Sequence, residues 1–141
     1  MMFVLDTNVV SELRKVRAGK ADPNVAAWAE SVDATVLFVS AITIIELELG
    51  VLAIERKDAT QGAMLRSWLE QQVLPEFSAR TLSIDTAVAQ RCARLHVPDK
   101  RGERDALLAA TALVHGMTVV TRNVADFEPT GVPVINPWES M

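Results

Sequence analysis

The chain has 141 residues, a net charge of −4 and one cysteine, with a pI near 5.2. This length buries enough apolar surface for a single domain, and we expect one domain over residues 1–141. One cysteine excludes an internal disulfide and a cysteine-rich zinc site, which is typical of a reducing compartment. The acidic balance excludes a generally basic nucleic-acid clamp. Because no basic leader and no apolar run of about 18 residues occurs, we expect a cytoplasmic protein without a membrane span.

Short apolar runs alternate with helical patterns along the chain, which predicts an α/β domain with a central parallel sheet. The expected strands cover residues 3–5, 36–39, 81–84, 118–121 and 132–135. The expected helices are a short one from Asn8, one that begins at Pro23 behind an Asp22 cap, a hairpin of 42–56 with 60–72, then 85–96, and 105–115 ended by Gly116.

Two of these strands run directly into polar residues. The first ends at Asp6, and the fourth ends at Thr121, with Asn123 and Asp126 close behind. Because the carboxyl ends of parallel strands meet at one edge of a sheet, ligands bind there and we expect these side chains to lie together. Asp6 precedes a predicted helix and Asp105 begins one, at positions where aspartate can serve as an N-cap; capping and metal binding are compatible uses of one side chain.

Glu46 lies in the helical segment ITIIELELG. The helical period predicts one apolar core stripe, with Glu46 on its border next to small residues, and places Glu48 with Glu55 on a solvated face. An unpaired carboxylate at a core border costs several kcal/mol, so Glu46 needs a partner. The residues of the predicted core stripe are Ile42, Ile45, Leu49 and Leu52.

If Asp6, Glu46, Asp105 and Asp126 converge, their charges must be compensated. Two like charges about 4 Å apart repel by roughly 4 kcal/mol at an effective dielectric near 20. Either some carboxylates take up protons, or a divalent cation lies among them. An all-oxygen ligand set favours Mg²⁺ or Mn²⁺ over zinc. The other metal-ligand types, Cys92, His96 and His115, are interpreted as structural.

Four segments, LDTNVVSEL, SAITIIELELG, RDALLAATALVHG and VTRNVADF, resemble in order and spacing the PIN-domain ribonucleases, in particular the VapC-type toxins and their FitB-like branch. The resemblance extends to the closing NPW at 136–138. It implies a three-layer α/β/α sandwich around a central, mainly parallel five-stranded sheet. It also implies an endoribonuclease that depends on Mg²⁺ or Mn²⁺, acts as the toxin of a type II toxin–antitoxin pair, forms a homodimer and is blocked by a cognate antitoxin.

The resemblance also assigns site residues. The first three acids of the family's site match Asp6, Glu46 and Asp105. The fourth is either Asp126, which we prefer, or the position of Asn123, which then supplies only a hydrogen bond. Thr7 and Thr121 match hydroxyls that orient the acids or a water, and Thr121 is included among the candidate catalytic residues.

Two basic clusters offer contacts for an RNA backbone. We predict RNA binding by Arg14 in the first cluster and by Lys100, Arg101 and Arg104 in the second, which directly precedes Asp105. The alternative for both clusters is solvated loop charge. The three tryptophans fit packing better than base stacking.

Three other functions compete with the nuclease. An aspartyl phosphotransferase also begins with a strand that ends in Asp, but it needs a second Asp where this chain has Asn8. A receiver-like Mg²⁺-binding domain expects a Lys at the end of a late strand, where this chain has Arg122. A catalytically silent relative that binds RNA or a partner is the third.

Overall fold

The computed structural model describes residues 1–139, and its centre is a five-stranded sheet in which every neighbouring pair of strands is parallel. The strand order is β3-β2-β1-β4-β5. The strands are β1 (Phe3–Leu5), β2 (Leu37–Ser40), β3 (Thr81–Leu82), β4 (Thr118–Val120) and β5 (Val134–Ile135). The chain lays β2 and β3 on one side of β1 and β4 and β5 on the other, so strand order reverses at β1.

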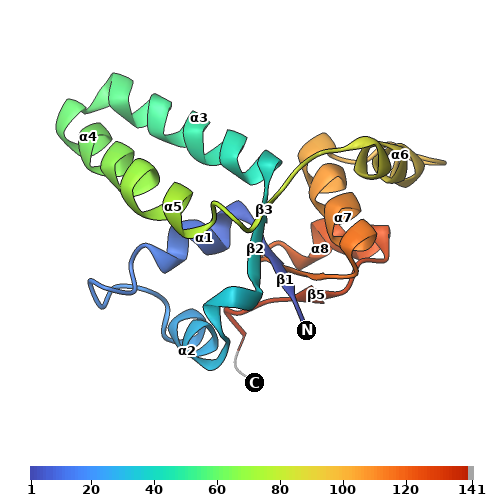
Figure 1. Cartoon of the computed structure of the whole chain (residues 1–141), viewed down its shortest axis with the longest axis horizontal. Helices are drawn as coiled ribbons and strands as arrows, with labels where there is room; N and C mark the ends of the chain where they lie inside the picture. The colour runs from blue at the N-terminus through green and yellow to red at the C-terminus, as the bar shows by residue number, and fades with distance from the viewer. Residues whose placement is uncertain (140–141) are drawn as a thin grey trace.

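Helices cover both faces of this sheet and make three layers (Figure 1). The helices are α1 (Thr7–Leu13), α2 (Pro23–Ser31), α3 (Ala41–Lys57), α4 (Ala59–Trp68), α5 (Leu74–Glu76), α6 (Thr86–Leu95), α7 (Glu103–His115) and α8 (Val124–Phe127). A π-helical stretch, Leu69–Val73, joins α4 to α5, and short 3-10 turns cover Ala34–Val36 and Glu128–Thr130. Helices α1 to α5 lie on one side of the sheet in Figure 1, and α6 to α8 lie on the other. The predicted α/β/α sandwich is therefore confirmed.

Each face of the sheet has its own apolar core. On one face, Leu5 and Val39 pack with residues of the helical hairpin such as Leu69. On the other, Val4 and Val119 pack with Leu108 of α7. Alternate residues of a strand point to opposite faces, so β1 contributes to both cores and is buried along its whole length. This burial fixes the position of whatever follows β1.

Local signals set most of the helix ends. Asp22 caps α2 by accepting hydrogen bonds from the backbone of residues 24 and 25, and Gly116 ends α7 in the left-handed conformation, at φ 66°. The expected start of α7 at Asp105 is wrong. The helix begins at Glu103 with Gly102 in the N-cap position, so Asp105 lies in the first turn and does not cap the helix.

The predicted core stripe of α3 is wrong at three of its four residues, because only Ile42 of that stripe is buried. Ile45, Leu49 and Leu52 are 46 to 48% exposed, whereas the buried side chains include Leu47 and Val51. Helix α3 carries two apolar stripes, and the sheet together with α4 covers the one that contains Leu47 and Val51. Periodicity identifies stripes but does not tell which of two is covered.

Helices α3 and α4 form a tight hairpin. A Cβ on Gly62 of α4 would lie 2.6 Å from the Cα of Glu55 on α3, so only glycine allows this approach. Arg66 of α4 pairs with Glu48 at 2.5 Å and with Glu55 at 3.0 Å on α3, and with Glu70 at 3.3 Å. Glu48 and Glu55 therefore face an arginine, which corrects their assignment to a solvated face. Within residues 1–139, no helix combines the length and hydropathy that crossing a membrane requires.

Candidate active site

Asp6 lies at the carboxyl end of β1, where the strand order reverses. Its side chain is 7% exposed. One carboxylate oxygen, Oδ1, accepts the backbone N–H of Thr7 at 2.8 Å, and the other, Oδ2, accepts the hydroxyl of Thr121 at 2.7 Å. Asp6 is also the N-cap of α1. The sequence predicted both features of Asp6, its place at the edge of the sheet and its place at the start of a helix.

Thr121 connects the ends of β1 and β4. While its hydroxyl donates to Asp6, the same oxygen accepts the backbone N–H of Asn123 at 3.0 Å and the side-chain amide of Asn8 at 3.4 Å. The side-chain oxygen of Asn8 in turn accepts the backbone N–H of Arg122 at 3.4 Å. Asn123 thus supplies a hydrogen bond through its backbone. Asn8 was missed as a site residue, although its place two residues after Asp6 was a usable signal.

Glu46 reaches the same edge from the second turn of α3. Its Oε1 accepts the hydroxyl of Thr7 at 2.9 Å, which links it through one residue to Asp6. Its Oε2 lies 3.6 Å from Nη1 of Arg104 on α7. Glu46 therefore has a charged partner, as predicted for a carboxylate at the border of the core. This partner, Arg104, was itself predicted to bind RNA.

Asp105 and Asp126 complete the group electrostatically. Burial, together with the smaller effect of the charges of Asp6, Asp126 and Glu46, raises the pKa of Asp105 to about 6. Burial also raises the pKa of Asp6 against the opposing hydrogen bonds from Thr121 and Thr7, with Glu46 and Asp126 adding to the rise. Carboxylates from β1, α3, α7 and α8 thus lie close enough to repel one another.

The donor chemistry of these four carboxylates fits a hard divalent cation, which prefers oxygen ligands. In this arrangement, no three Asp, Glu, His or Cys side chains of residues 1–139 are gathered closely enough to hold a metal ion. Both oxygens of Asp6 face hydrogen-bond donors, while Glu46 faces Thr7 on one side and Arg104 on the other. Each carboxylate oxygen has two lone pairs, so these contacts leave acceptor capacity for a cation.

The predicted RNA-binding residues divide between two places. Arg14 lines a pocket of about 240 Å³ together with Thr7, Glu46 and Trp68, which brings it to the candidate site. Its guanidinium carbon lies 5.8 Å from the centroid of the Trp68 ring. The other three residues lie in the 97–105 region: Lys100 and Arg101 on the loop before α7, and Arg104 in the first turn of that helix.

That second region is held by His96, the C-cap of α6. The Nδ1 atom of His96 accepts the backbone N–H of Arg101 at 3.0 Å, and the Arg101 side chain donates to the carbonyl oxygen of Leu95 at 3.2 Å. Lys100 is exposed. His96 thus stabilises this loop through a ring nitrogen that accepts a backbone hydrogen bond.

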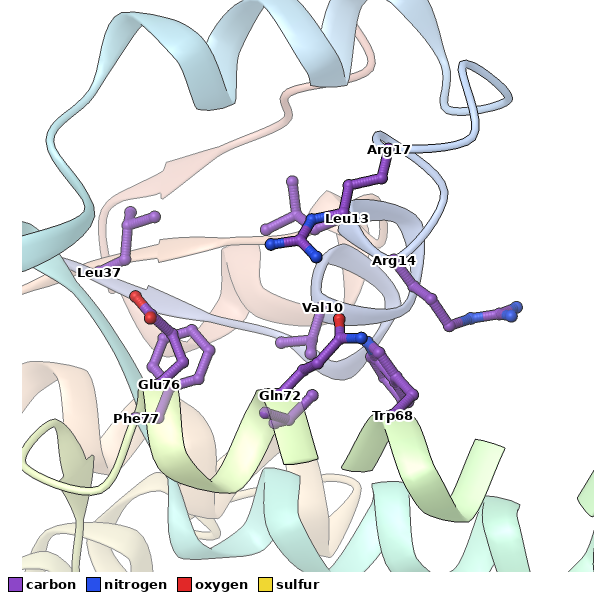
Figure 2. Close-up of a pocket in the computed structure, with 10 residues that line it drawn as sticks. Val10, Leu13, Arg14, Arg17, Leu37, Trp68, Gln72, Glu76 and Phe77 are labelled. Atoms are coloured by element: carbon purple, nitrogen blue, oxygen red, sulfur yellow. The ribbon is translucent and has the colours of Figure 1, made fainter. Parts of the chain in front are cut away.

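A second pocket, of about 220 Å³, lies beside the site between α1 and the α4–α5 segment (Figure 2). Val10, Leu13 and Phe77 contribute apolar surface, and Arg14 and Arg17 contribute two basic side chains. No signal in the sequence pointed to this pocket, because its residues are brought together only by the packing of the hairpin against α1.

The model of the PIN domain matches residues 3–129. The chain belongs to the PIN-domain family. VapC ribonuclease Y4jK of Sinorhizobium fredii is 38% identical to it over 98% of this chain and 99% of that protein. Toxin FitB of Neisseria gonorrhoeae is 36% identical over 97% of this chain and 99% of its own. The predicted resemblance to VapC-type and FitB-like PIN domains is thereby confirmed.

Solved structures agree with this assignment. The crystal structure of FitAcB from Neisseria gonorrhoeae superimposes with a TM-score of 0.88 at 35% identity, covering 99% of this chain and 100% of that one. A toxin–antitoxin complex from Klebsiella pneumoniae contains a chain with a TM-score of 0.64 at 26% identity, covering 97% of this PIN domain and 98% of its own length. The α/β PIN fold therefore extends over nearly the whole described chain.

Proposed function

We propose that this PIN domain is an Mg²⁺- or Mn²⁺-dependent endoribonuclease and the toxin of a type II toxin–antitoxin pair. The proposal rests on four carboxylates near one edge of the sheet that are close enough for their charges to act on one another, and on Arg104 being the only cationic side chain of residues 1–139 paired with any of them. The ribonuclease and toxin activities named for the two relatives support the same chemistry. The carboxylates concerned are Asp6, Glu46, Asp105 and Asp126.

In this proposal Asp6 and Asp105 are the main cation ligands, and Glu46 and Asp126 complete the set. A bound divalent cation supplies a water of lowered pKa and stabilises the charge that develops on the leaving oxygen of the phosphodiester. The hydroxyl of Thr121 fixes the orientation of Asp6 through its 2.7 Å hydrogen bond. Thr7 fixes Asp6 through its backbone N–H and Glu46 through its hydroxyl.

Basic side chains near this edge would hold the RNA backbone. Arg14 shares a pocket with Glu46, and Lys100 stands exposed on the loop that leads to Asp105. Each phosphate contact releases a counterion, so RNA affinity should fall as salt rises. Replacing Lys100 or Arg14 should reduce that salt dependence by about one contact each.

The test is cleavage of end-labelled RNA by the purified protein with Mg²⁺, with and without EDTA, alongside the Asp6→Asn variant. The proposal predicts cleavage by the wild type with Mg²⁺ only, and none above background by Asp6→Asn. Cleavage that persists in EDTA, or in the Asp6→Asn variant at the wild-type rate, would contradict it. An acyl phosphate on Asp6 would instead support the phosphotransferase or receiver alternatives, and RNA binding without cleavage would support a silent relative.

We also infer an antitoxin partner, in line with the toxin–antitoxin complex among the structural neighbours. The apolar pocket in Figure 2 has Arg14 and Arg17 among its lining residues, which suits an amphipathic segment with acidic side chains. Coexpression with the protein encoded directly upstream tests this inference. Arg17→Glu should weaken the complex, and an unchanged complex would remove this pocket from the interface.

A homodimer is the expected assembly. Ile45, Leu49 and Leu52 form an exposed apolar stripe on α3, and half of all residues in the chain are apolar. Such a stripe on a small domain is typical of an interface, and a second copy with the same stripe fits the symmetric arrangement common in dimers. Leu49→Arg should convert the protein to a monomer in light scattering. A wild-type monomer would contradict the proposal.

A further inference from the structure

Arg104 lies beside the candidate site, but its guanidinium pairs with Glu46 and is therefore not free to bind a phosphate. It occupies the first turn of α7, one residue before Asp105. Its Nη1 lies 3.6 Å from Oε2 of Glu46, and the two side chains are 54% and 27% exposed. In the described part of the chain, no other arginine or lysine pairs with any of the four carboxylates. The guanidinium thus stands where a cation is needed.

The contact with Arg104 also helps to fix the position of the Glu46 side chain. Thr7 donates to Oε1 and Arg104 approaches Oε2, so protein groups face both oxygens of this carboxylate. Asp6 is fixed on both oxygens by uncharged donors. Within residues 1–139, Glu46 is therefore the one carboxylate of the site that contacts a positive charge, which is the charge that a metal ion also carries. This contact accompanies an arrangement in which the side chains of residues 1–139 form no ready metal site.

We propose that Arg104 is an internal counter-cation of the site, which holds Glu46 while no divalent ion is bound and competes with that ion for the carboxylate. This inference rests on the proposed function, since it concerns the same cation. An exposed ion pair of this length is weak, so a divalent ion can displace it. Displacement leaves Arg104, on its long side chain, free to contact a phosphate bidentately.

This competition makes Arg104 a determinant of how much cation the site requires. The guanidinium of Arg104 must leave Glu46 before a metal ion can bind there. The free energy of the Arg104–Glu46 pair is therefore subtracted from that of metal binding. Lys100 carries the same charge on the loop just before α7, but its side chain makes no hydrogen bond or ion pair within residues 1–139. Replacing Lys100 removes a charge without removing a competitor for Glu46.

The experiment measures Mn²⁺ binding to the RNA-free protein at fixed ionic strength, by the loss of the paramagnetic resonance signal of free Mn²⁺. The variants are Arg104→Gln, its charge-matched control Lys100→Gln, and Arg104→Lys, which keeps the charge without the planar guanidinium. We expect the dissociation constant for Mn²⁺ to fall about 2- to 5-fold in Arg104→Gln and less than 2-fold in Lys100→Gln. Arg104→Lys should lie between Arg104→Gln and the wild type.

The outcomes separate this inference from the proposed function. A wild type that binds Mn²⁺ and cleaves RNA, with Arg104→Gln binding Mn²⁺ no more tightly than Lys100→Gln does, would overturn the role of Arg104 alone. A wild type that neither binds Mn²⁺ nor cleaves RNA would overturn both proposals. Arg104 and Lys100 are both solvent-exposed, and a circular dichroism melt of each of the three variants verifies that it is folded.

Discussion

Two groups of acidic side chains in this PIN domain show opposite arrangements of charge. In the α3–α4 hairpin, Glu48, Glu55 and Glu70 surround Arg66, whose bonds to Glu55 and Glu48 raise the arginine's pKa. At the sheet edge, four carboxylates lie near one another, and the exposed Arg104 is the only cationic side chain of residues 1–139 paired with any of them; the pKa values of Asp6 and Asp105 are raised. The first group is compensated within the chain, and the second is not.

The difference indicates which acids serve stability and which serve chemistry. Pairing with arginine stabilises the charged form of a carboxylate and so favours the folded state. A carboxylate that repels its neighbours lowers the stability of the fold unless a cation from solution binds it. Acids that repel one another and are nevertheless held in place by hydrogen bonds, as Asp6 is by Thr7 and Thr121, are typical of a functional site. The following predictions test this contrast, from the largest expected effect to the smallest.

The strongest test exchanges one acid of each group for its amide. Asp105→Asn should lower the rate of RNA cleavage with Mg²⁺ by about 100-fold or more, because a lost ligand withdraws several kcal/mol of charge stabilisation from the transition state. Glu55→Gln should leave the rate per folded molecule within about twofold of the wild type. Equal losses in the two variants would show that the contrast has no functional meaning.

The hairpin should respond through stability instead. Gly62→Ala places a Cβ 2.6 Å from the Cα of Glu55, and this overpacking should cost about 1 to 3 kcal/mol of unfolding free energy. Gly50→Ala on α3 meets nothing within 4 Å and should stabilise the protein by up to about 1 kcal/mol, because alanine is the better helix former. Urea denaturation of both variants measures the difference. A destabilised Gly50→Ala would contradict the open surface found there.

Removing the arginine of the hairpin should have a smaller effect. Arg66→Gln leaves three glutamates without their shared partner and should lower the midpoint of urea denaturation, because the network loses its only cation among residues 1–139. Arg56→Gln, at an exposed arginine for which no ion pair is recorded within residues 1–139, is the matched control and should change stability by less than about 0.5 kcal/mol. The same loss in both variants would mean that the network contributes nothing specific.

The pH dependence of stability should show the smallest effect. In EDTA, the folded protein holds a proton on Asp105 up to about pH 6, against 3.8 for the ordinary side chain. The folded state therefore binds more protons between these values, and this contribution to stability is lost as pH rises from about 4 to 6. Asp105→Asn should then exceed the wild type in unfolding free energy by about 1 kcal/mol at pH 7.5, after allowance for solvent screening, and not at pH 4. An equal difference at both pH values would contradict the raised pKa.

Much of the site was predictable because it depends on local rules. A buried strand that runs into Asp6, and another that runs into Thr121, predict a polar edge in any parallel sheet. The exposed face of α3 was not predictable in the same way. Its two apolar stripes have similar periodicity, and only the packing of α4 and the sheet decides that Leu47 and Val51 are buried.

Contacts between distant charges were also beyond the sequence. Arg66 lies 11 residues from Glu55 and 18 from Glu48, and their pairing depends on how closely the hairpin closes over Gly62. Arg104 was predicted to bind RNA from its place in a basic cluster, yet its nearest charged partner is Glu46, 58 positions earlier. Helical spacing alone gives no information about such pairs.

The most direct test of the account is a crystal of the protein soaked in Mn²⁺, examined by anomalous scattering. The account predicts a peak at the carboxyl end of β1, with carboxylate oxygens of both Asp6 and Asp105 at coordination distance, about 2.2 Å. No peak at that edge at saturating Mn²⁺, or a peak held by other residues, would contradict the claim that these carboxylates share a cation.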